Sequence, residues 1–333
     1  MVRGSKATTI SAVAQAAGVS PATVSRVMNG RFYGEPEIAE RVREAARELD
    51  YSPNHLARSF AMGQTNAIAF LVPDLANPTF QTVLASLSKA AAADGYRVLV
   101  ADSAESADDE PVLAAEIRHR CDALVLCAPR MSDEALGVAT STLGPVVLLN
   151  RLSPATSAPT LTVDSRTGFE RLAQHLYGLG HRSFAYVQGP EGPANENRLR
   201  GIDDFRRTVS GTTLTRIPGG AGSDSGQAAV DEVVESDATA VLAFNDLVAI
   251  GLLHGLVRRG IRVPDDISVT GFDDIPFARL MSPSLTTASV PHEALGTLAW
   301  NRMRSLIDGS TPEHDVVFQP RLELRESTGP SPR

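Results

Sequence analysis

Side chains able to recognise DNA are concentrated between residues 9 and 31 of this 333-residue chain. Arg26 carries a planar guanidinium that can donate two hydrogen bonds to one guanine, and Ser25 and Asn29 can hydrogen-bond phosphates or base edges. Residues 1–34 contain four Lys or Arg side chains and no Asp or Glu. A basic, hydroxyl-rich segment of this kind predicts contact with nucleic acid.

Two short helices joined by a sharp turn would present these side chains. Val13 and Ala17 share one helical face, and Gly18 follows at a position where a left-handed residue ends a helix. Ser20 is a good N-cap and Pro21 suits the first helical position, so a second helix begins there. The pattern predicts a helix-turn-helix; a helical hairpin packed inside a larger protein is the alternative. The outward positions of the second helix are Pro21, Ala22, Ser25, Arg26 and Asn29.

A short hinge helix is predicted after this motif. Pro53 can begin a helix that ends before Gly63, and about eight residues are too few for a helix to be stable alone. Its apolar face consists of Leu56, Ala57 and Phe60, which predicts a wedge for a DNA minor groove. A plain linker with a helical tendency is the alternative.

The composition is that of a folded protein without a membrane segment. Hydrophobic residues make up 43% of the chain, and no apolar run approaches the roughly 20 residues that span a bilayer. The N-terminus lacks an apolar signal segment, so we expect a cytoplasmic protein. Cys121 and Cys127 have no metal-ligand spacing and are expected to be buried free thiols, and we expect no metal and no cofactor. The net charge of −8 divides into +2 for residues 1–62 and −10 for residues 63–333, so only the N-terminal part is expected to touch DNA.

From residue 66 onward, strand-like and helix-like runs alternate. The strand-like runs are Ala67–Val72, Arg97–Ala101, Ala123–Cys127, Val146–Leu149, Phe184–Gln188, Ala240–Phe244 and Ile267–Thr270. The helical runs include Thr79–Ala93, Gly168–Gly180, Leu199–Val209 and Leu247–Arg259. This alternation predicts two doubly wound α/β subdomains without a dinucleotide or phosphate loop, so the fold class is α/β with an all-α helix-turn-helix domain at the N-terminus.

Three regions follow from these patterns. A helical period between residues 38 and 49 predicts a third helix, which completes a DNA-binding domain over residues 1–52. A hinge helix and linker take residues 53–65, and an effector-binding and dimerisation domain takes residues 66–333. Its N-subdomain is expected over about 66–162 and 291–320, and its C-subdomain over about 163–290 and 321–333.

Polar and aromatic side chains collect where the predicted strands end. These residues are Asp74, Asn77, Phe80, Asn150, Arg151, Asn245, Asp246, Asp273 and Asp274. Open parallel sheets bind ligands at the carboxyl ends of their strands, so two facing subdomains would place these side chains around one cleft for a small polar ligand. Each residue by itself is more often a turn residue or a helix cap. The chain has no Gly-x-Ser-x-Gly or His-Glu-x-x-His motif, and we expect no enzyme.

Eight segments in order along the chain carry a family resemblance: TISAVAQAAGVSPATVSRVMNG, YSPNHLARSF, VPDLANPTF, RLRG at 198–201, FND at 244–246, GFDD at 271–274, PSLTT at 283–287 and LELRES at 322–327. Through them the chain resembles the lactose and purine repressor family of bacterial transcription regulators over essentially its whole length. The resemblance implies a homodimer with two recognition helices in adjacent major grooves of a near-palindromic operator and hinge helices in the central minor groove. It also implies a large domain similar to periplasmic sugar-binding proteins, in which a bound ligand changes the affinity for DNA.

The resemblance assigns roles residue by residue. Base-reading positions correspond to Pro21, Ala22 and Arg26, and phosphate-positioning sites to Ser20, Thr23, Ser25, Asn29 and Asn54. Effector contacts correspond to Asn77, Phe80, Arg151, Arg198, Asn245 and Asp273. Three positions depart from the family: Phe60 replaces the usual leucine wedge, Asn150 a common aspartate and Val290 a frequent glutamine.

The combined expectation is a ligand-responsive repressor that binds double-stranded operator DNA as a homodimer and is released by a sugar or sugar derivative. A regulator with a purine-type corepressor is one alternative. A sugar-binding transport protein is another, but it would have a signal peptide and no helix-turn-helix. No leucine-rich heptad follows Ser327, which argues against tetramers built by a terminal coiled coil.

Overall fold

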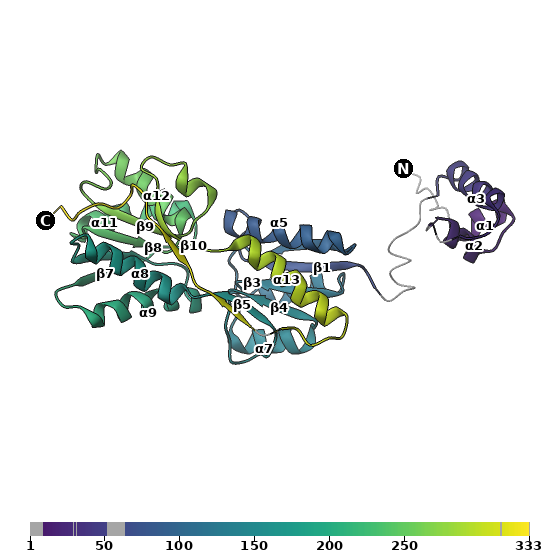
Figure 1. Ribbon diagram of the computed structural model, residues 1–333, viewed down its shortest axis with the longest axis horizontal. Helices are drawn as coiled ribbons and strands as arrows, with labels where there is room; N and C mark the ends of the chain where they lie inside the picture. Colours follow the sequence, from purple (N-terminus) through teal and green to yellow (C-terminus); the bar gives the residue numbers. More distant parts are fainter. Residues whose placement is uncertain (1–8, 29, 31, 52–63, 314, 333) are drawn as a thin grey trace, which may run out of the picture. The chain divides into compact units, whose positions relative to one another are not determined.

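The computed structural model describes residues 9–28, 30, 32–51, 64–313 and 315–332. The chain divides into two compact units, residues 1–65 and residues 66–333 (Figure 1). The hinge helix expected between Pro53 and Gly63, with Asn54, Ala57 and Phe60, lies outside the described residues, as does Asn29.

Three helices form the N-terminal unit. They are α1 (Ile10–Ala17), α2 (Pro21–Met28) and α3 (Pro36–Glu48). The Thr9 side chain accepts a backbone hydrogen bond at the start of α1, and Gly18 ends that helix with a φ of 66°. Val13, Val24 and Val42, one from each helix, belong to one small core and are fully buried. The local signals therefore produce the predicted helix-turn-helix and third helix.

Two six-stranded sheets form the large unit (Figure 1). The first sheet contains β1 (Ala67–Val72), β2 (Arg97–Asp102), β3 (Ala123–Cys127), β4 (Val146–Leu149), β5 (Thr160–Val163) and β11 (Val316–Phe318). The second contains β6 (Ser183–Val187), β7 (Thr213–Ile217), β8 (Ala240–Ala243), β9 (Ser268–Asp273), β10 (Thr286–Ser289) and β12 (Arg321–Glu323). Their orders are β11-β5-β4-β3-β1-β2 and β12-β10-β9-β8-β6-β7, and every pair is parallel except β10 with β12. The chain therefore passes between the sheets three times, after β5, after β10 and after β11.

Helices cover both sheets. Beside the first sheet lie α5 (Pro78–Ala93), α6 (Glu110–Arg118), α7 (Asp133–Thr142) and α13 (His292–Ile307). Beside the second lie α8 (Ser165–Gly178), α9 (Pro193–Thr208), α10 (Ser223–Ala228), α11 (Val230–Glu235), α12 (Asp246–Arg258) and the 3-10 turn η1 (Pro276–Arg279). Helix α13 packs directly on α5: a Cβ at Gly296 would come within 2.3 Å of the Val83 carbonyl oxygen, so only glycine permits this approach.

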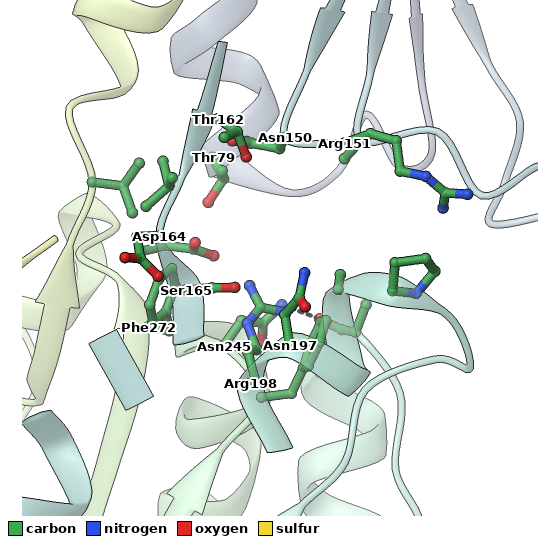
Figure 2. A pocket seen from close by; sticks show the side chains of 18 of the residues that line it. Thr79, Asn150, Arg151, Thr162, Asp164, Ser165, Asn197, Arg198, Asn245 and Phe272 are labelled. Carbon is green, nitrogen blue, oxygen red and sulfur yellow. Dashed lines mark hydrogen bonds between the residues drawn. The ribbon is translucent and has the colours of Figure 1, made fainter. Parts of the chain in front are cut away.

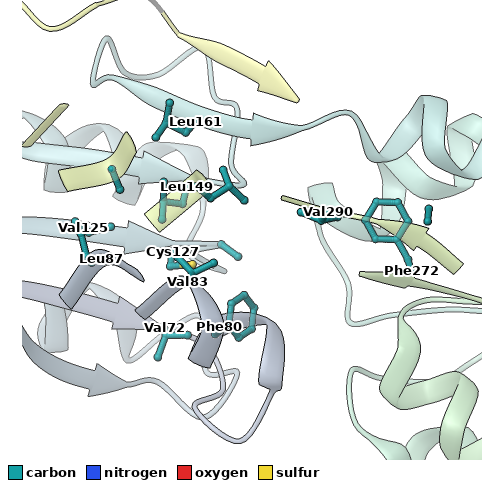
Figure 3. Close-up of a cluster of buried hydrophobic side chains, with 14 of the residues drawn as sticks. Val72, Phe80, Val83, Leu87, Val125, Cys127, Leu149, Leu161, Phe272 and Val290 are labelled. Carbon is teal, nitrogen blue, oxygen red and sulfur yellow. The ribbon is translucent and has the colours of Figure 1, made fainter. Parts of the chain in front are cut away.

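The central strands are apolar because both of their faces are covered. β3 and β8 are buried along their whole length, and Val125 and Cys127 of β3 pack with Val83 of α5 (Figure 3). The same buried cluster includes Phe272 of the second sheet, so side chains of both sheets belong to one core. Two parallel sheets with fully buried central strands confirm the α/β fold class predicted from the sequence.

Both cysteines are buried free thiols. Burial raises the pKa of the Cys121 thiol to about 11 and that of the Cys127 thiol to about 12, which keeps both protonated at neutral pH. None of the helices in the described residues is long and apolar enough to cross a membrane.

Candidate DNA-binding helix and effector cleft

Helix α2 presents the residues predicted to contact DNA. Val24 and Val27 are buried against the other two helices, while Pro21, Ala22 and Arg26 are exposed. This division follows from helical spacing, which puts positions three residues apart on one face. The side chain of Arg26 is therefore available to solvent, and to the edge of a base pair if α2 enters a major groove.

The hydroxyl groups of Ser20 and Thr23 lie at the N-terminus of α2. Ser20 Oγ accepts a hydrogen bond from Thr23 N at 3.2 Å and lies 3.0 Å from Thr23 Oγ1. Both residues, predicted as phosphate-positioning sites, thus serve first as the helix cap. The first turn of α2 contains no acidic residue, so its partial positive charge is available to a phosphate.

In the large unit, four helices begin at the ends of strands that border one cavity. Asn77 Oδ1 accepts from Thr79 N at 3.0 Å to cap α5, and Asn245 Oδ1 accepts from Val248 N at 2.9 Å to cap α12. Asp164 caps α8 through Thr167 N at 3.0 Å. Asn77 and Asn245 are therefore helix caps, and both also line the cavity.

The cavity has a volume of about 410 Å³, within the range of sites for small molecules. All six residues predicted as effector contacts line it: Asn77, Phe80, Arg151, Arg198, Asn245 and Asp273. Asn150 and Val290, the two departures from the family, line it as well. Figure 2 shows Thr79, Asn150 and Arg151 on one side of the opening and Asn197, Arg198 and Asn245 on the other.

Arg198 lies at the base of this cavity, packed against two aromatic rings. Its guanidinium carbon lies 3.8 Å from the centroid of the Phe244 ring and 4.9 Å from that of Phe272. More than nine-tenths of the side chain is buried, and its Nε and Nη1 have no hydrogen-bond partner among the residues that the structure describes. Burial lowers the pKa of Arg198, and the Asp273 carboxylate offsets part of that fall. Both atoms are covered in this structure, and the Phe272 ring is also stacked on Phe169, with ring centroids 5.5 Å apart. Unpaired guanidinium donors and aromatic rings at the base of a cavity are typical of sites that bind hydroxyls and the apolar face of a sugar.

Asp273 lies in a turn with an unusual backbone. Its φ is 113° and that of Asp274 is 59°, values that favour glycine. Burial raises the pKa of Asp273, and the Arg198 and His292 side chains offset part of the rise. Asp274 is held by Arg325, whose Nη2 donates to Asp274 Oδ1 at 2.6 Å.

Asp246 supports this turn from the start of α12. Its Oδ2 accepts from Ile275 N at 2.8 Å, directly after the turn, and its Oδ1 accepts from Thr287 Oγ1 at 2.6 Å. A Cβ at Gly271 would lie 2.2 Å from Asp246 Oδ1, so the close approach requires glycine there. Burial, and then the Asp273 carboxylate, raise the pKa of Asp246 well above its usual value. Asp246 is buried and does not line the cleft. Its hydrogen bond to Ile275 N holds the backbone next to Asp273 and Asp274.

The sequence-based list omitted several residues that line the cavity. Among them are Arg130, Asp164, Ser165, Asn197, Phe244 and Phe272. Phe244 and Phe272 directly precede Asn245 and Asp273, and Arg130 follows the end of β3 as Arg151 follows β4. The strand-end rule could have found these three. Asn197 lies one turn inside α9, whose start was predicted six residues too late, at Leu199 rather than Pro193.

Comparisons with known proteins agree with this architecture. Residues 9–54 match the model of bacterial regulatory proteins of the lacI family, and residues 173–328 match that of a periplasmic binding protein-like domain. The transcriptional regulator GalR of Escherichia coli K12 is 32% identical, over 96% of this chain and 95% of its own length. The structure of the lac repressor dimer bound to operator and the anti-inducer ONPF covers 97% of this chain and 100% of its own, with 26% identity and a TM-score of 0.84. The complex of the regulator CelR with cellobiose covers 96% and 99%, with 28% identity and a TM-score of 0.70.

A helix-turn-helix unit joined to a periplasmic-binding-type α/β unit with a cleft defines a ligand-responsive DNA-binding regulator. With the identity and coverage of GalR, the chain belongs to the lacI family of bacterial regulatory proteins. It is a transcriptional regulator that binds DNA.

Proposed function

We propose that this regulator is a repressor that binds a near-palindromic operator as a homodimer in the cytoplasm and leaves it when a sugar-like effector enters the cleft. The observation that carries the proposal is the cleft floor, where Arg198 lies between Phe244 and Phe272 and beside Asp273. A guanidinium, a carboxylate and aromatic faces suit the hydroxyls and the apolar face of a sugar ring. CelR has been solved with cellobiose, and the lac repressor as a dimer on its operator, which supports the same assignments here.

The proposed division of labour follows the chain. Residues 1–52 would bind DNA, residues 53–65 would form the hinge, and residues 66–333 would bind effector and dimerise. Pro21, Ala22 and Arg26 are the proposed base contacts, and Ser20, Thr23 and Ser25 contact phosphates. Asn29, Asn54, Ala57 and Phe60 stay predictions, because they lie outside the described residues.

An equilibrium shift would link the cleft to DNA. An effector changes DNA affinity only if it binds one arrangement of the two sheets better than the other. The chain passes between the sheets at only three places in the large unit, and Asp164 and Val290, which line the cleft, lie at two of them. Bound ligand is therefore well placed to change the angle between the two sheets.

The test combines operator selection with an effector screen. The full-length protein would be used to enrich duplexes from a random pool, and fluorescence anisotropy would measure its affinity for the selected sequence. We expect a near-palindrome, a stoichiometry of two chains per duplex, and at least tenfold weaker binding in the presence of one sugar or sugar derivative. A purine that tightens binding would instead identify a corepressor. Turnover of a sugar to product, with no change in DNA affinity, would contradict the proposal.

A further inference from the structure

The charge of the cleft lining is opposite to that of the rest of the large unit. Four arginines and two aspartates line the cavity, an excess of two positive charges, whereas residues 63–333 carry 23 basic and 33 acidic side chains. These charged lining residues are Arg130, Arg151, Arg166, Arg198, Asp164 and Asp273. Three of these arginines are ion-paired with acidic side chains outside the lining: Arg130 with Glu105, Arg151 with Asp133 and Arg166 with Asp204.

The positive charges are not evenly spread. Asp273 is coupled to Arg198, so that part of the cavity is close to neutral. Figure 2 shows Asp164 at one end of the cavity and the Arg151 side chain extending toward the other. Both Asp164 oxygens already accept hydrogen bonds, from Thr167 and Gln319, so this carboxylate already has partners within the protein.

Arg151 has an unused donor at its end of the cleft. Only 6% of its side chain is exposed, and its Nη2 donates to Asp133 Oδ1 at 2.8 Å and to the Met131 carbonyl oxygen at 3.3 Å. Its Nε is buried and has no acceptor in the described part of the chain. A buried guanidinium N–H without an acceptor is costly, so the side chain gains a hydrogen bond if it turns this N–H toward an acceptor of a ligand in the cavity.

Arg130 lies in the same region and is ion-paired with Glu105. Its Nε and Nη2 donate to the two carboxylate oxygens of Glu105, at 2.6 and 3.0 Å, and Nη1 donates to the Ala128 carbonyl oxygen. Arg130 and Arg151 also both line two outer cavities, next to Gly192 and Pro193. The guanidiniums are thus held together at the mouth of the cleft by partners that lie outside its lining.

Helix α9 begins at this mouth without a side-chain cap. Asn77, Asp164 and Asn245 cap the other three helices that start at the cleft, whereas Gly192, the N-cap of α9, has no side chain to do so. Pro193 and Ala194, the first two residues of this 16-residue helix, line the cavity. Glu196 in the first turn is paired with Arg200, and the partial positive charge of the helix N-terminus lies next to Arg151.

We propose that the effector is an anionic sugar, whose carboxylate or phosphate group is bound by Arg151 at the N-terminus of α9 while its ring hydroxyls bind Arg198 and Asp273. This inference rests on the proposed function, since it names the class of sugar. A charged acceptor forms hydrogen bonds about twice as strong as those of a neutral hydroxyl. Of the acidic side chains around the mouth, Asp133, Asp108 and Glu191 are exposed to solvent, so water screens their repulsion, and the half-buried Glu105 is paired with Arg130.

The test compares matched sugars on the purified full-length protein. Thermal shift and then titration calorimetry would be run with glucose, glucuronate and glucose 6-phosphate; galactose, galacturonate and galactose 6-phosphate; fructose and fructose 6-phosphate; ribose and ribose 5-phosphate. Inorganic phosphate alone is the control for an adventitious ion. In the best-binding set, we expect an anionic member to bind at least tenfold tighter than its neutral parent; whether it is the uronate or the phosphate identifies the anion.

Arg151→Gln is the diagnostic variant. It should lower the affinity for the anionic member at least tenfold more than the affinity for the neutral parent, and binding of the neutral parent shows that the variant is folded. Arg151→Lys keeps the charge without the planar fork and should retain part of the preference. The control is Arg200→Gln. Arg200 lies on α9, is exposed and is paired with Glu196 at 3.0 Å, so this change should leave the preference unchanged.

Each other outcome has a definite meaning. A neutral parent that binds as tightly as its anionic partner overturns the inference, and if that neutral sugar also releases operator, the proposed function stands. Equal affinity for inorganic phosphate and for the phosphosugar would show an adventitious ion only. If Arg151→Gln lowered the affinity for the anionic and the neutral member equally, Arg151 would have a structural role only. If no sugar in the set binds, both the inference and the sugar effector of the proposed function are wrong.

Discussion

Arg26 and Arg198 show how differently the two units of this protein present one side chain. Arg26 lies exposed on α2, available to a partner that approaches from outside, and its position follows from a helical period of a few residues. Arg198 is buried against Phe244 and Phe272 and meets Asp273, 75 residues further along the chain (273 − 198). The DNA-binding surface is thus built from local structure on a small core, whereas the cleft depends on the assembly of two sheets.

The comparison predicts that the two sites can be inactivated independently. The largest effect is expected for Asp273→Ala, which removes the carboxylate that faces Arg198 and leaves a buried guanidinium without a charged neighbour. Effector affinity should fall about 100-fold, or about 2.7 kcal/mol, while operator affinity without effector stays nearly unchanged. Titration calorimetry and anisotropy measure the two quantities, with the exposed Asp224→Ala as control. A variant that still leaves the operator at normal effector concentration would show that Asp273 is not in the ligand site.

The reciprocal change is Arg26→Ala. Loss of a bidentate contact to one base pair should weaken operator binding by about 1–3 kcal/mol and relax the preference at that position, with no change in effector affinity. Binding to a set of single-substitution operators checks this prediction. Arg43→Ala removes an equal charge from α3, where Arg43 is paired with Glu40, and should not alter base preference. If Arg26→Ala weakened binding to every sequence equally, Arg26 would be a phosphate contact.

A smaller effect, on stability, would sharpen the contrast between exposed and buried charge. The raised pKa of Asp246 means that the folded state binds its proton more tightly than the unfolded state does. Its contribution to the free energy of unfolding is therefore present at acidic pH, below the unfolded pKa of about 4, and is lost as the pH rises through the folded pKa. Asp246→Asn removes this titration, so the stability of the wild type relative to the variant should decline with rising pH, by at most about 1.4 kcal/mol per pH unit.

Urea unfolding of both proteins between pH 4 and 8 measures that difference. The other shifted groups, among them His175, His181 and Glu110, are common to the two proteins and largely cancel in the comparison. Parallel stability curves would mean that Asp246 titrates alike in the folded and unfolded states.

Much of the fold was predictable because it is encoded in short-range pattern. Seven strands were anticipated from apolar runs, but β5, β7 and β10 were missed because threonine makes their hydrophobic pattern weak, and β11 and β12 because three residues establish no period. Helix α9 was predicted to start too late because its first turns are polar on every side. These elements become strands or helices through their neighbours in the assembled sheets rather than through their own propensity.

The sequence by itself determined the helix-turn-helix, the alternation of strands and helices, and the uneven charge, since caps, turns and hydrophobic periods act between residues close in the chain. It also supplied candidate cleft residues, because strand ends can be recognised one at a time. Only the tertiary structure decided which of them meet. Asn77 and Asp273 are 196 residues apart (273 − 77) and line one cavity because two separate sheets turn their strand ends toward it. The unused donors of Arg151 and Arg198 were equally invisible in the sequence, since an unpaired hydrogen-bond donor is defined by everything packed around it.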